Sequence, residues 1–281
     1  MSPLVPIALL ILISLILYWQ LIIAEGAYLG RRVVALLYDL VAARYNAIKQ
    51  YDDDDDARFL GEPLTLSLQG VSRPLVLDVA TGTSRLPLAL FRQPLFTGRV
   101  VALDNARRML REAARYVAAH HERVTWVWHH AAPLPFDDNV FDAVCCLEAL
   151  EFMPDTRRAL AECVRVLKPG GLLLVTNRIN TGARFMPGKT YHRDKFEALL
   201  AALHQTDVTT QAWQFDYDLI WSLKPGDDVS AGDVPAQAAN PIELLRCPRD
   251  RGALQLHDAH LTCAACGRRY PIGADGVVEL L

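Results

Sequence analysis

The stretch that decides the fold is Pro74-Leu-Val-Leu-Asp-Val-Ala-Thr-Gly-Thr-Ser84, followed by Arg85-Leu-Pro-Leu-Ala-Leu-Phe91. The apolar run predicts a buried strand, the small residues after Asp78 predict a tight turn, and the second segment predicts a helix. A strand that leads through such a turn into a helix N-terminus is typical of nucleotide-type cofactor sites. A second apolar run ends at Asp104, where a carboxylate can accept hydrogen bonds from both hydroxyls of a ribose. The two segments predict a site for an adenosine-containing cofactor.

The rest of the central region alternates between strand and helix patterns. Strands are expected at residues 75–79, 100–104, 124–129, 141–147 and 172–177, with helices at 85–92, 106–119 and 156–167. Such a series folds into a mainly parallel sheet covered by helices on both faces. A helix at about 193–204 and two strands, 207–213 and 215–223, follow, and the two strands are close enough to form a hairpin. The predicted fold class is therefore α/β, a Rossmann-like sheet of mostly parallel strands with an antiparallel edge strand.

The N-terminal segment is the most apolar part of the chain. Residues 4–24 carry no charge and as a helix would span roughly 31 Å, about the thickness of the hydrocarbon core of a bilayer. A signal peptide is the other interpretation, but no basic segment precedes the run. Basic residues follow the run, among them Arg31, Arg32, Arg44 and Lys49. We therefore expect residues 1–25 to be a single-pass membrane anchor, with the body of the protein facing the cytoplasm.

A helical lead-in is expected over residues 26–60. Apolar residues recur at helical spacing between residues 31 and 51. This pattern fits either a helix packed on the main domain or an interfacial helix lying on the membrane. The five aspartates at 52–56 fit a solvated loop or a helix N-terminus better than a cation site, because the run lacks turn glycines.

Composition narrows the function classes further. The 281 residues carry a formal net charge of −3 without a clear basic patch, so nucleic acid is not an expected partner. Cys145, Cys146 and Cys163 fall in apolar stretches and are interpreted as buried thiols rather than as a disulfide framework. A nicotinamide site is disfavoured because the turn after Asp78 lacks the G-x-G-x-x-G pattern.

Three ordered segments resemble one known family. They are Val76-Leu-Asp-Val-Ala-Thr-Gly-Thr83, Leu134-Pro-Phe-Asp-Asp-Asn-Val-Phe-Asp-Ala-Val144 and Glu162-Cys-Val-Arg-Val-Leu-Lys-Pro-Gly-Gly-Leu-Leu-Leu-Val175. Together they resemble the class I S-adenosylmethionine-dependent methyltransferases, most closely the group that includes the ubiquinone and menaquinone C-methyltransferases. The resemblance implies a methyltransferase domain over residues 61–225, with S-adenosylmethionine as cofactor.

The resemblance also implies cofactor-binding residues. Asp78 organises the turn and meets the methionine ammonium, and Asp104 binds the ribose. His130 stands where relatives often have the acid that binds adenine, and its neighbour Ala131 can also contribute. Of the three glycine positions of the turn only Gly82 holds glycine, because Ala80 and Ser84 occupy the others. The full implied set is Asp78, Ala80, Thr81, Gly82, Ser84, Asp104, Asn105, Met109, His130, Ala131 and Leu147.

Methyl transfer from a sulfonium is an in-line displacement. The protein mainly aligns the nucleophile with the methyl group and excludes water, and a general base helps only when the acceptor carries a proton. The candidate catalytic residues are Glu148, His130, Glu151 and His192. Phe152 stands where relatives often place a histidine, which removes one base and makes the cleft more apolar.

The C-terminal segment carries a second pattern. Cys247-Pro-Arg-Asp250 and Cys263-Ala-Ala-Cys266-Gly267 have the spacing of a zinc ribbon. Residues 242–281 resemble the small zinc-ribbon proteins that partner and stabilise methyltransferases, with Asp250 in place of a cysteine ligand. The resemblance implies Zn²⁺ bound by Cys247, Asp250, Cys263 and Cys266, and a protein partner for this unit; a metal-free ribbon is the other interpretation. Residues 226–241 are polar and proline-bounded and are interpreted as a linker.

These features combine into one functional hypothesis and a rival. The hypothesis is a membrane-anchored S-adenosylmethionine-dependent methyltransferase that acts on a small molecule, a lipid or a quinone. The rival is a membrane-tethered binding protein that uses a non-catalytic methyltransferase fold as a scaffold. Cofactor binding distinguishes the two, because the scaffold does not require it.

Overall fold

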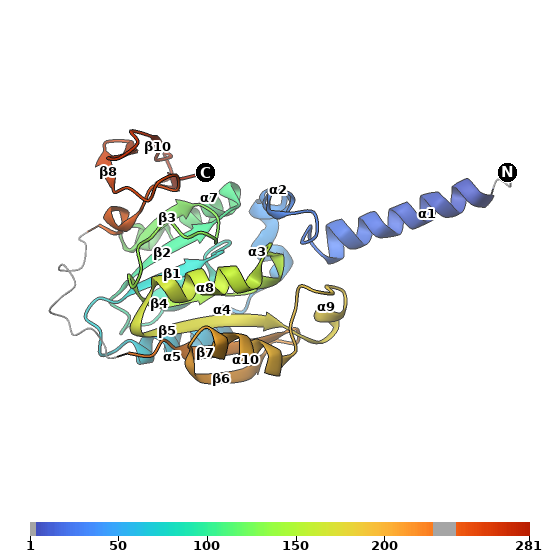
Figure 1. The fold of residues 1–281 in the computed structure, drawn as a ribbon, viewed down its shortest axis with the longest axis horizontal. Helices are drawn as coiled ribbons and strands as arrows, with labels where there is room; N and C mark the ends of the chain where they lie inside the picture. The colour runs from blue at the N-terminus through green and yellow to red at the C-terminus, as the bar shows by residue number, and fades with distance from the viewer. Residues whose placement is uncertain (1–3, 227–239) are drawn as a thin grey trace.

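The computed structural model of the chain describes residues 4–226 and 240–281. The predicted linker lies outside these residues, apart from Gly226, Asn240 and Pro241. Within the described ranges the chain forms a large sheet, helices on both of its faces, an N-terminal helix that projects from the body and a small C-terminal sheet (Figure 1).

The large sheet confirms the predicted fold class. Its strand order is β11-β3-β2-β1-β4-β5-β7-β6, and the pairs from β11 to β5 are parallel, whereas β7 is antiparallel to both β5 and β6. The strands are β1 Leu75–Val79, β2 Arg99–Asp104, β3 Val124–Trp128, β4 Phe141–Cys146, β5 Leu167–Arg178, β6 Thr206–Trp213, β7 Tyr217–Leu223 and β11 Val278–Glu279. The first seven overlap the predicted strands, although β5 begins at Leu167 rather than at residue 172. The pattern is clearest for β1 to β4, because buried parallel strands are nearly continuous apolar runs.

Two helical layers bury the two faces of the sheet. Side chains of β1 alternate between them, since Leu77 belongs to one apolar cluster and Val76 to the other. The first cluster includes residues of α8 and α10, and the second includes residues of α5, α6 and α7. These helices are α5 Glu62–Ser67, α6 Arg85–Phe91, α7 Arg107–Tyr116, α8 Thr156–Val166 and α10 Arg193–Ala202, and the short α9 Asn180–Arg184 follows β5.

The N-terminal segment is one long apolar helix. It comprises α1 Leu4–Tyr18 and a π-helical turn, Trp19–Ile23, and none of its residues is buried. Its length and composition are sufficient to span a membrane. The predicted lead-in is helical but broken, with α2 Arg31–Val41, α3 Tyr45–Lys49 and α4 Asp53–Asp56. The aspartate run forms a helix N-terminus, because the side chain of Asp52 accepts hydrogen bonds from the backbone N–H groups of Asp54 and Asp55.

The C-terminal residues form a three-stranded antiparallel sheet and then join the large one. The small sheet contains β8 Leu254–His257, β9 His260–Cys263 and β10 Arg269–Pro271. β11 extends the large sheet beside β3, and Arg107 of α7 pairs with Asp275 and Glu279 at 2.8 Å each. Residues of the small sheet, including Leu261 and Tyr270, share an apolar cluster with the large sheet. The chain pattern does not predict this attachment, because the two-residue β11 is too short to give a strand signal.

Candidate cofactor site and metal cluster

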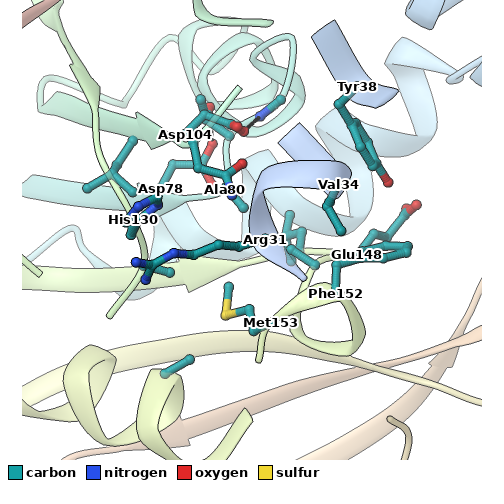
Figure 2. A pocket seen from close by; sticks show the side chains of 18 of the residues that line it. Arg31, Val34, Tyr38, Asp78, Ala80, Asp104, His130, Glu148, Phe152 and Met153 are labelled. Carbon is teal, nitrogen blue, oxygen red and sulfur yellow. Dashed lines mark hydrogen bonds between the residues drawn. The ribbon is translucent and has the colours of Figure 1, made fainter. Parts of the chain in front are cut away.

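A cavity of about 210 Å³ lies at the carboxyl ends of β1, β2 and β4. Carboxyl ends of neighbouring parallel strands meet at one edge of a sheet, which is where open α/β sheets bind ligands. Figure 2 shows Asp78, Asp104 and His130 on one side of this cavity and Val34, Tyr38 and Phe152 on the other.

The turn after β1 forms the floor of the cavity. Thr81 donates a hydrogen bond from its hydroxyl to Asp78 at 2.6 Å, and the backbone N–H of Gly82 donates to Asp104 at 2.8 Å. Ala80, Gly82 and Ser84 all have positive φ, at 58°, 55° and 75°. The turn therefore keeps the left-handed backbone of a glycine turn although only one of the three positions is glycine, at a steric cost for the two side chains.

Asp104 ends β2 with its carboxylate fixed by backbone donors. The N–H of Ala106 donates to Oδ1 and that of Gly82 to Oδ2, both at 2.8 Å, so each oxygen keeps acceptor capacity toward the cavity. Burial raises the pKa of Asp104 to about 6. Burial, with the neighbouring Asp104 charge, raises the pKa of Asp78 to about 7, against a lowering by the Thr81 hydrogen bond. Two buried carboxyl groups thus face the cavity, and no basic side chain among the described residues pairs with either.

His130 presents an unused polar atom at the cavity. Its Nδ1 is buried and has no hydrogen-bond partner within residues 4–226 and 240–281, and burial together with the positive charge of Arg31 lowers its pKa to about 4. The imidazole is therefore neutral at pH 7 and one ring nitrogen can accept a hydrogen bond. The adjacent His129 lines the same cavity, and its ring Nδ1 lies 2.9 Å from the backbone oxygen of His130.

The outer wall is aromatic and comes mostly from the lead-in helices. Val34 and Tyr38 of α2, Tyr45 of α3, Tyr51 and Phe152 all line the cavity. Tyr38 lies edge-on to Phe152, with ring centroids 5.9 Å apart. The helical lead-in is thus packed on the main domain, as the first of its two interpretations predicts, and it covers the carboxyl edge of the sheet.

An ion cluster closes one end of the cavity. Arg85, the first residue of α6, makes a bidentate pair with Asp56 at 2.7 and 2.6 Å and a second pair with Glu148. Its guanidinium also stacks over Tyr51 and Trp213, at 4.1 and 4.5 Å from the ring centroids. Lys49 lies 3.7 Å from Glu148. This cluster fixes the α4 segment against α6 and holds the Glu148 carboxylate in place.

The cysteine pattern converges at a separate point. One donor atom from each of Cys247, Asp250, Cys263 and Cys266 lies within 4.8 Å of the others. The Sγ atoms of Cys247 and Cys266 are 3.8 Å apart, and Asp250 Oδ1 is 3.3 Å from Cys263 Sγ. A tetrahedral zinc ion with Zn–S bonds near 2.3 Å places its ligand atoms about 3.7 Å apart, so this donor set fits zinc.

Comparison with known proteins agrees with both patterns. Residues 77–175 match the family described as methyltransferase domain, and residues 242–273 match the family described as Trm112p-like protein. Residues 77–175 are thus similar to a methyltransferase domain, and residues 242–273 to a Trm112p-like protein. Its similarity to curated proteins is concentrated in about half of its length.

Two bacterial relatives illustrate that similarity. The demethylmenaquinone methyltransferase of Thermobifida fusca is 36% identical over 145 residues, which are 51% of this chain and 60% of the relative. The ubiquinone/menaquinone biosynthesis C-methyltransferase UbiE of Enterobacter sp. is 37% identical over 147 residues, which are 51% of this chain and 58% of the relative. The chain therefore spans about three fifths of the length of these proteins.

Solved structures show the same fold at low identity. A chain from the complex of the Haloferax volcanii Trm112 methyltransferase activator with a methyltransferase is 19% identical, with a TM-score of 0.51, over 67% of this chain and 98% of that one. The [4+2]-cyclase SpnF is 20% identical, with a TM-score of 0.55, over 70% of this chain and 96% of that one. Since one of these two similar structures is a cyclase, the fold alone does not assign a reaction.

Most of the predicted cofactor residues of the methyltransferase domain line one cavity. They are Asp78, Ala80, Thr81, Gly82, Asp104, Asn105, His130, Ala131 and Leu147. Ser84 and Met109 do not line it. Ser84 is fully buried at the start of α6, and Met109 is fully buried in a small cluster with Ala42 and Ala106. In the described structure these two residues shape the site from behind and offer the cavity no contact.

The candidate bases divide in the same way. Glu148 and His130 line the cavity, whereas Glu151 and His192 do not. Glu151 is 2% exposed and accepts a hydrogen bond from Tyr217 at 2.7 Å, and burial raises its pKa. His192 is exposed at the start of α10. The apolar pattern of β4 predicts where the strand ends but does not indicate which side chains of the following turn point into the cavity.

Several lining residues were not anticipated as site residues. They include Arg31, Val34, Tyr38, Tyr45, Tyr51, Arg85 and Met153. The helical spacing of residues 31–51 predicts an amphipathic helix. This spacing is the sequence signal for the lining residues between Arg31 and Tyr51. Nothing in the chain pattern pairs Arg85 with the aspartate run or with Glu148.

Proposed function

We propose that the protein is an S-adenosylmethionine-dependent methyltransferase. The observation that carries the proposal is the cavity in which Asp78, Asp104 and the turn between Ala80 and Gly82 meet at the carboxyl edge of the sheet. Asp104 has free acceptor capacity for two ribose hydroxyls, Asp78 can pair with the methionine ammonium, and neutral His130 can accept from the adenine amino group. The residues present fit the cofactor, which supplies the activated methyl group.

Cofactor binding and transfer test this proposal directly. Calorimetry of the full chain with S-adenosylmethionine should give saturable binding, and methyl-labelled cofactor should label a fraction of a membrane lipid extract. Absence of binding would leave only the scaffold hypothesis. Binding without transfer to any extract fraction would contradict the assigned reaction and keep the cofactor site.

A lipophilic, planar acceptor is the class that the wall of the cavity favours. Tyr38, Tyr45 and Phe152 offer aromatic faces, and such side chains stack on planar apolar rings. Two similar bacterial proteins are named for quinone methylation. We assign a quinone or a related lipid as acceptor. Mass analysis of membrane quinones and lipids with and without the protein should reveal one species that shifts by a single methyl group.

Glu148 is the proposed general base for an acceptor that carries a proton. It lines the cavity and is held by Arg85 and Lys49. Glu148→Gln keeps an acceptor oxygen for Arg85 but cannot take up a proton. The variant should bind S-adenosylmethionine as the parent does and transfer methyl groups about 10²-fold more slowly. Equal transfer rates would assign to Glu148 a purely structural role.

The apolar N-terminal helix is proposed as a single-pass anchor, with the body in the cytoplasm. Its 20 residues from Leu4 to Ile23 have a mean hydropathy of 2.4 in their most apolar window, and basic residues follow them. Alkaline carbonate should leave the full chain in the membrane pellet. Protease added outside intact cells should leave the body intact, and digestion of the body would reverse the assigned orientation.

The cysteine cluster is proposed as a structural zinc site, with Cys247, Asp250, Cys263 and Cys266 as its ligands. The spacing of the donors supports the proposal, because it matches a tetrahedral ion. Elemental analysis of chain purified reduced and without chelator should give about one zinc per chain. Asp250→Cys should hold zinc more tightly, since thiolate is the softer ligand. A zinc-free preparation would make the ribbon a metal-free unit, with a role in packing or in protein partner contact.

A further inference from the structure

The helix α2 has two apolar faces. In the part of the chain that the structure describes, one face packs on the body of the protein and the other is exposed. Val34 is buried and Tyr38 is half-buried, and both line the cavity. Leu36 and Leu40 lie on the opposite side of the helix and are 58% and 66% exposed. Leu29, just before the helix, is 47% exposed. Because α2 covers the carboxyl edge of the sheet, this outer face points away from the body of the protein.

The outer face lies at the same end of the molecule as the apolar N-terminal helix. In Figure 1, β5 runs toward α9, and α1 leaves the body at that end beside α2. Two hydrogen bonds tie the base of the N-terminal helix to the segment after α9. Trp19 donates from its indole to the backbone oxygen of Phe185 at 2.9 Å, and Tyr28 donates from its hydroxyl to that of Pro187 at 2.8 Å. Phe185 itself is 47% exposed.

Basic side chains flank these apolar ones. Arg32 and Arg44 are exposed before and after Leu36 and Leu40 in the chain, and Arg184 is exposed beside Phe185. Leucine and phenylalanine side chains with adjacent arginines are the composition of surfaces that lie in the headgroup region of a bilayer, because arginine reaches phosphate groups while its stem stays in apolar surroundings. A soluble partner is less favoured, because the apolar helix that begins the chain ends a few residues before this surface.

We infer that Leu29, Leu36, Leu40 and Phe185, with Arg32, Arg44 and Arg184, form a membrane-contact surface that seats α2 in the headgroup region of the bilayer. The inference rests on the proposed membrane span, and it assigns to α2 a double role. Its inner face is a wall of the cofactor cavity and its outer face contacts lipid. The cavity therefore lies directly beneath the bilayer surface, and a lipid-soluble acceptor reaches it beside α2 without crossing bulk water.

Photocrosslinking of the full chain to lipid tests the surface. The chain is reconstituted in vesicles of phosphatidylcholine and phosphatidylglycerol that contain a phospholipid with a diazirine near its glycerol backbone, and cross-linked peptides are mapped by mass spectrometry. We expect lipid on peptides that contain Leu36 and Leu40 and on those that contain Phe185, in addition to the N-terminal helix. Peptides that contain Leu95 and Leu256 are the internal control, since these leucines are 64% and 48% exposed but belong to other parts of the body.

A double substitution that introduces negative charge makes the test specific. Leu36→Glu with Leu40→Glu should remove most of the lipid from α2 and leave that on the N-terminal helix unchanged, whereas Leu95→Glu with Leu256→Glu should change neither. Lipid on the N-terminal helix but no more on α2 than on the control leucines would overturn the inference and keep the span. Lipid on neither the N-terminal helix nor α2 would overturn both the membrane-contact surface and the proposed membrane span. Calorimetry with S-adenosylmethionine on the same samples measures the proposed cofactor binding separately.

Discussion

Asp104 shows how a single carboxylate can organise a cofactor turn. It accepts hydrogen bonds from two backbone N–H groups, that of Gly82 in the turn after β1 and that of Ala106 after β2. Burial raises the pKa of the same carboxyl group. A ribose would supply hydrogen-bond donors to a carboxylate that the fold has already oriented, which reduces the entropic cost of binding.

The first prediction concerns this residue. Asp104→Ala removes the ribose hydrogen bonds, each charge-assisted and worth about 1.5–3 kcal/mol, so the affinity for S-adenosylmethionine should fall at least ~10-fold. Calorimetry measures the affinity, and near-UV circular dichroism confirms the fold. Asp142→Ala is the matched control. Asp142 is also a buried acid that accepts a hydrogen bond from a backbone N–H, that of Leu75. It belongs to β4 and lies beside the amino end of β1, at the opposite edge of the sheet from Asp104. An unchanged affinity in Asp104→Ala would refute the placement of the site.

A second prediction follows from the pKa values of the two cavity acids. Burial raises the pKa values of Asp78 and Asp104 to about 7 and about 6. The folded chain therefore holds these protons more tightly than the unfolded chain, and these two groups lower stability as pH rises from about 4 to 7. A bound ammonium favours the charged form of Asp78, so binding should release protons near pH 6.5 and weaken as pH falls below 6.

Calorimetry at pH 6.5 in two buffers of different ionisation enthalpy measures this proton release. Asp78→Asn should abolish most of it, because the amide cannot titrate. Asp142→Asn should leave it unchanged. Binding with no proton exchange in the parent chain would mean that Asp78 is already ionised in the free protein.

At the scale of the element, the five aspartates at 52–56 show how one residue of a uniform run takes part in a buried ion pair while its neighbours stay exposed. Asp56 is 4% exposed and pairs with Arg85 of α6, whereas the side chain of Asp54 is 97% exposed. The repetition is uniform in sequence, and only helical phase and the position of α6 decide which carboxylate turns inward. The pair ties the lead-in helices to the start of the cofactor turn.

The third prediction uses that contrast. Asp56→Ala leaves Arg85 buried with one carboxylate partner fewer, so the free energy of unfolding should fall by about 3 kcal/mol. Asp54→Ala removes only an exposed carboxylate 3.5 Å from Arg92 and should change it by less than ~0.5 kcal/mol. Urea denaturation of both variants measures the difference. Equal effects would show that the Asp56–Arg85 pair contributes nothing beyond a surface ion pair.

At the scale of the whole molecule, the zinc-ribbon-like unit and the large sheet are joined through β11. The backbone N–H of Leu280 donates to Trp128 of β3 at 3.2 Å, and Ile272, next to β10, forms a bridge with Val278. Trp128 in turn donates from its indole to the backbone oxygen of Asn105, the residue after Asp104. The unit is thus attached at the sheet edge nearest to β2 and β3, away from the turn that holds Asp78.

The fourth prediction follows from this attachment. Cys263→Ser should release the proposed zinc and speed amide exchange at residues 277–281, because metal affinity contributes to the folding of the ribbon. S-adenosylmethionine affinity should persist, since Asp78 and Asp104 are held by interior strands of the sheet. Hydrogen–deuterium exchange measures the effect, and Cys163→Ser, a buried thiol of α8 outside the cluster, is the control. Unchanged exchange after loss of Cys263 would make β11 independent of the ribbon.

The sequence by itself determined the central architecture and the cofactor half of the candidate site. The parallel strands β1 to β4 are largely apolar runs, Asp78 and Asp104 stand at the ends of two of them and Gly82 lies in the turn after β1, so local pattern is sufficient to place these residues. Tertiary structure alone decided the other half. Which face of α2 covers the cavity, which aspartate meets Arg85, and where β11 pairs all depend on contacts between segments far apart in the chain, and hydrophobic periodicity carries no information about such partners. Glu151 is close to Glu148 in the sequence but lies outside the cavity for the same reason, because a turn after a strand orients each side chain through its packing.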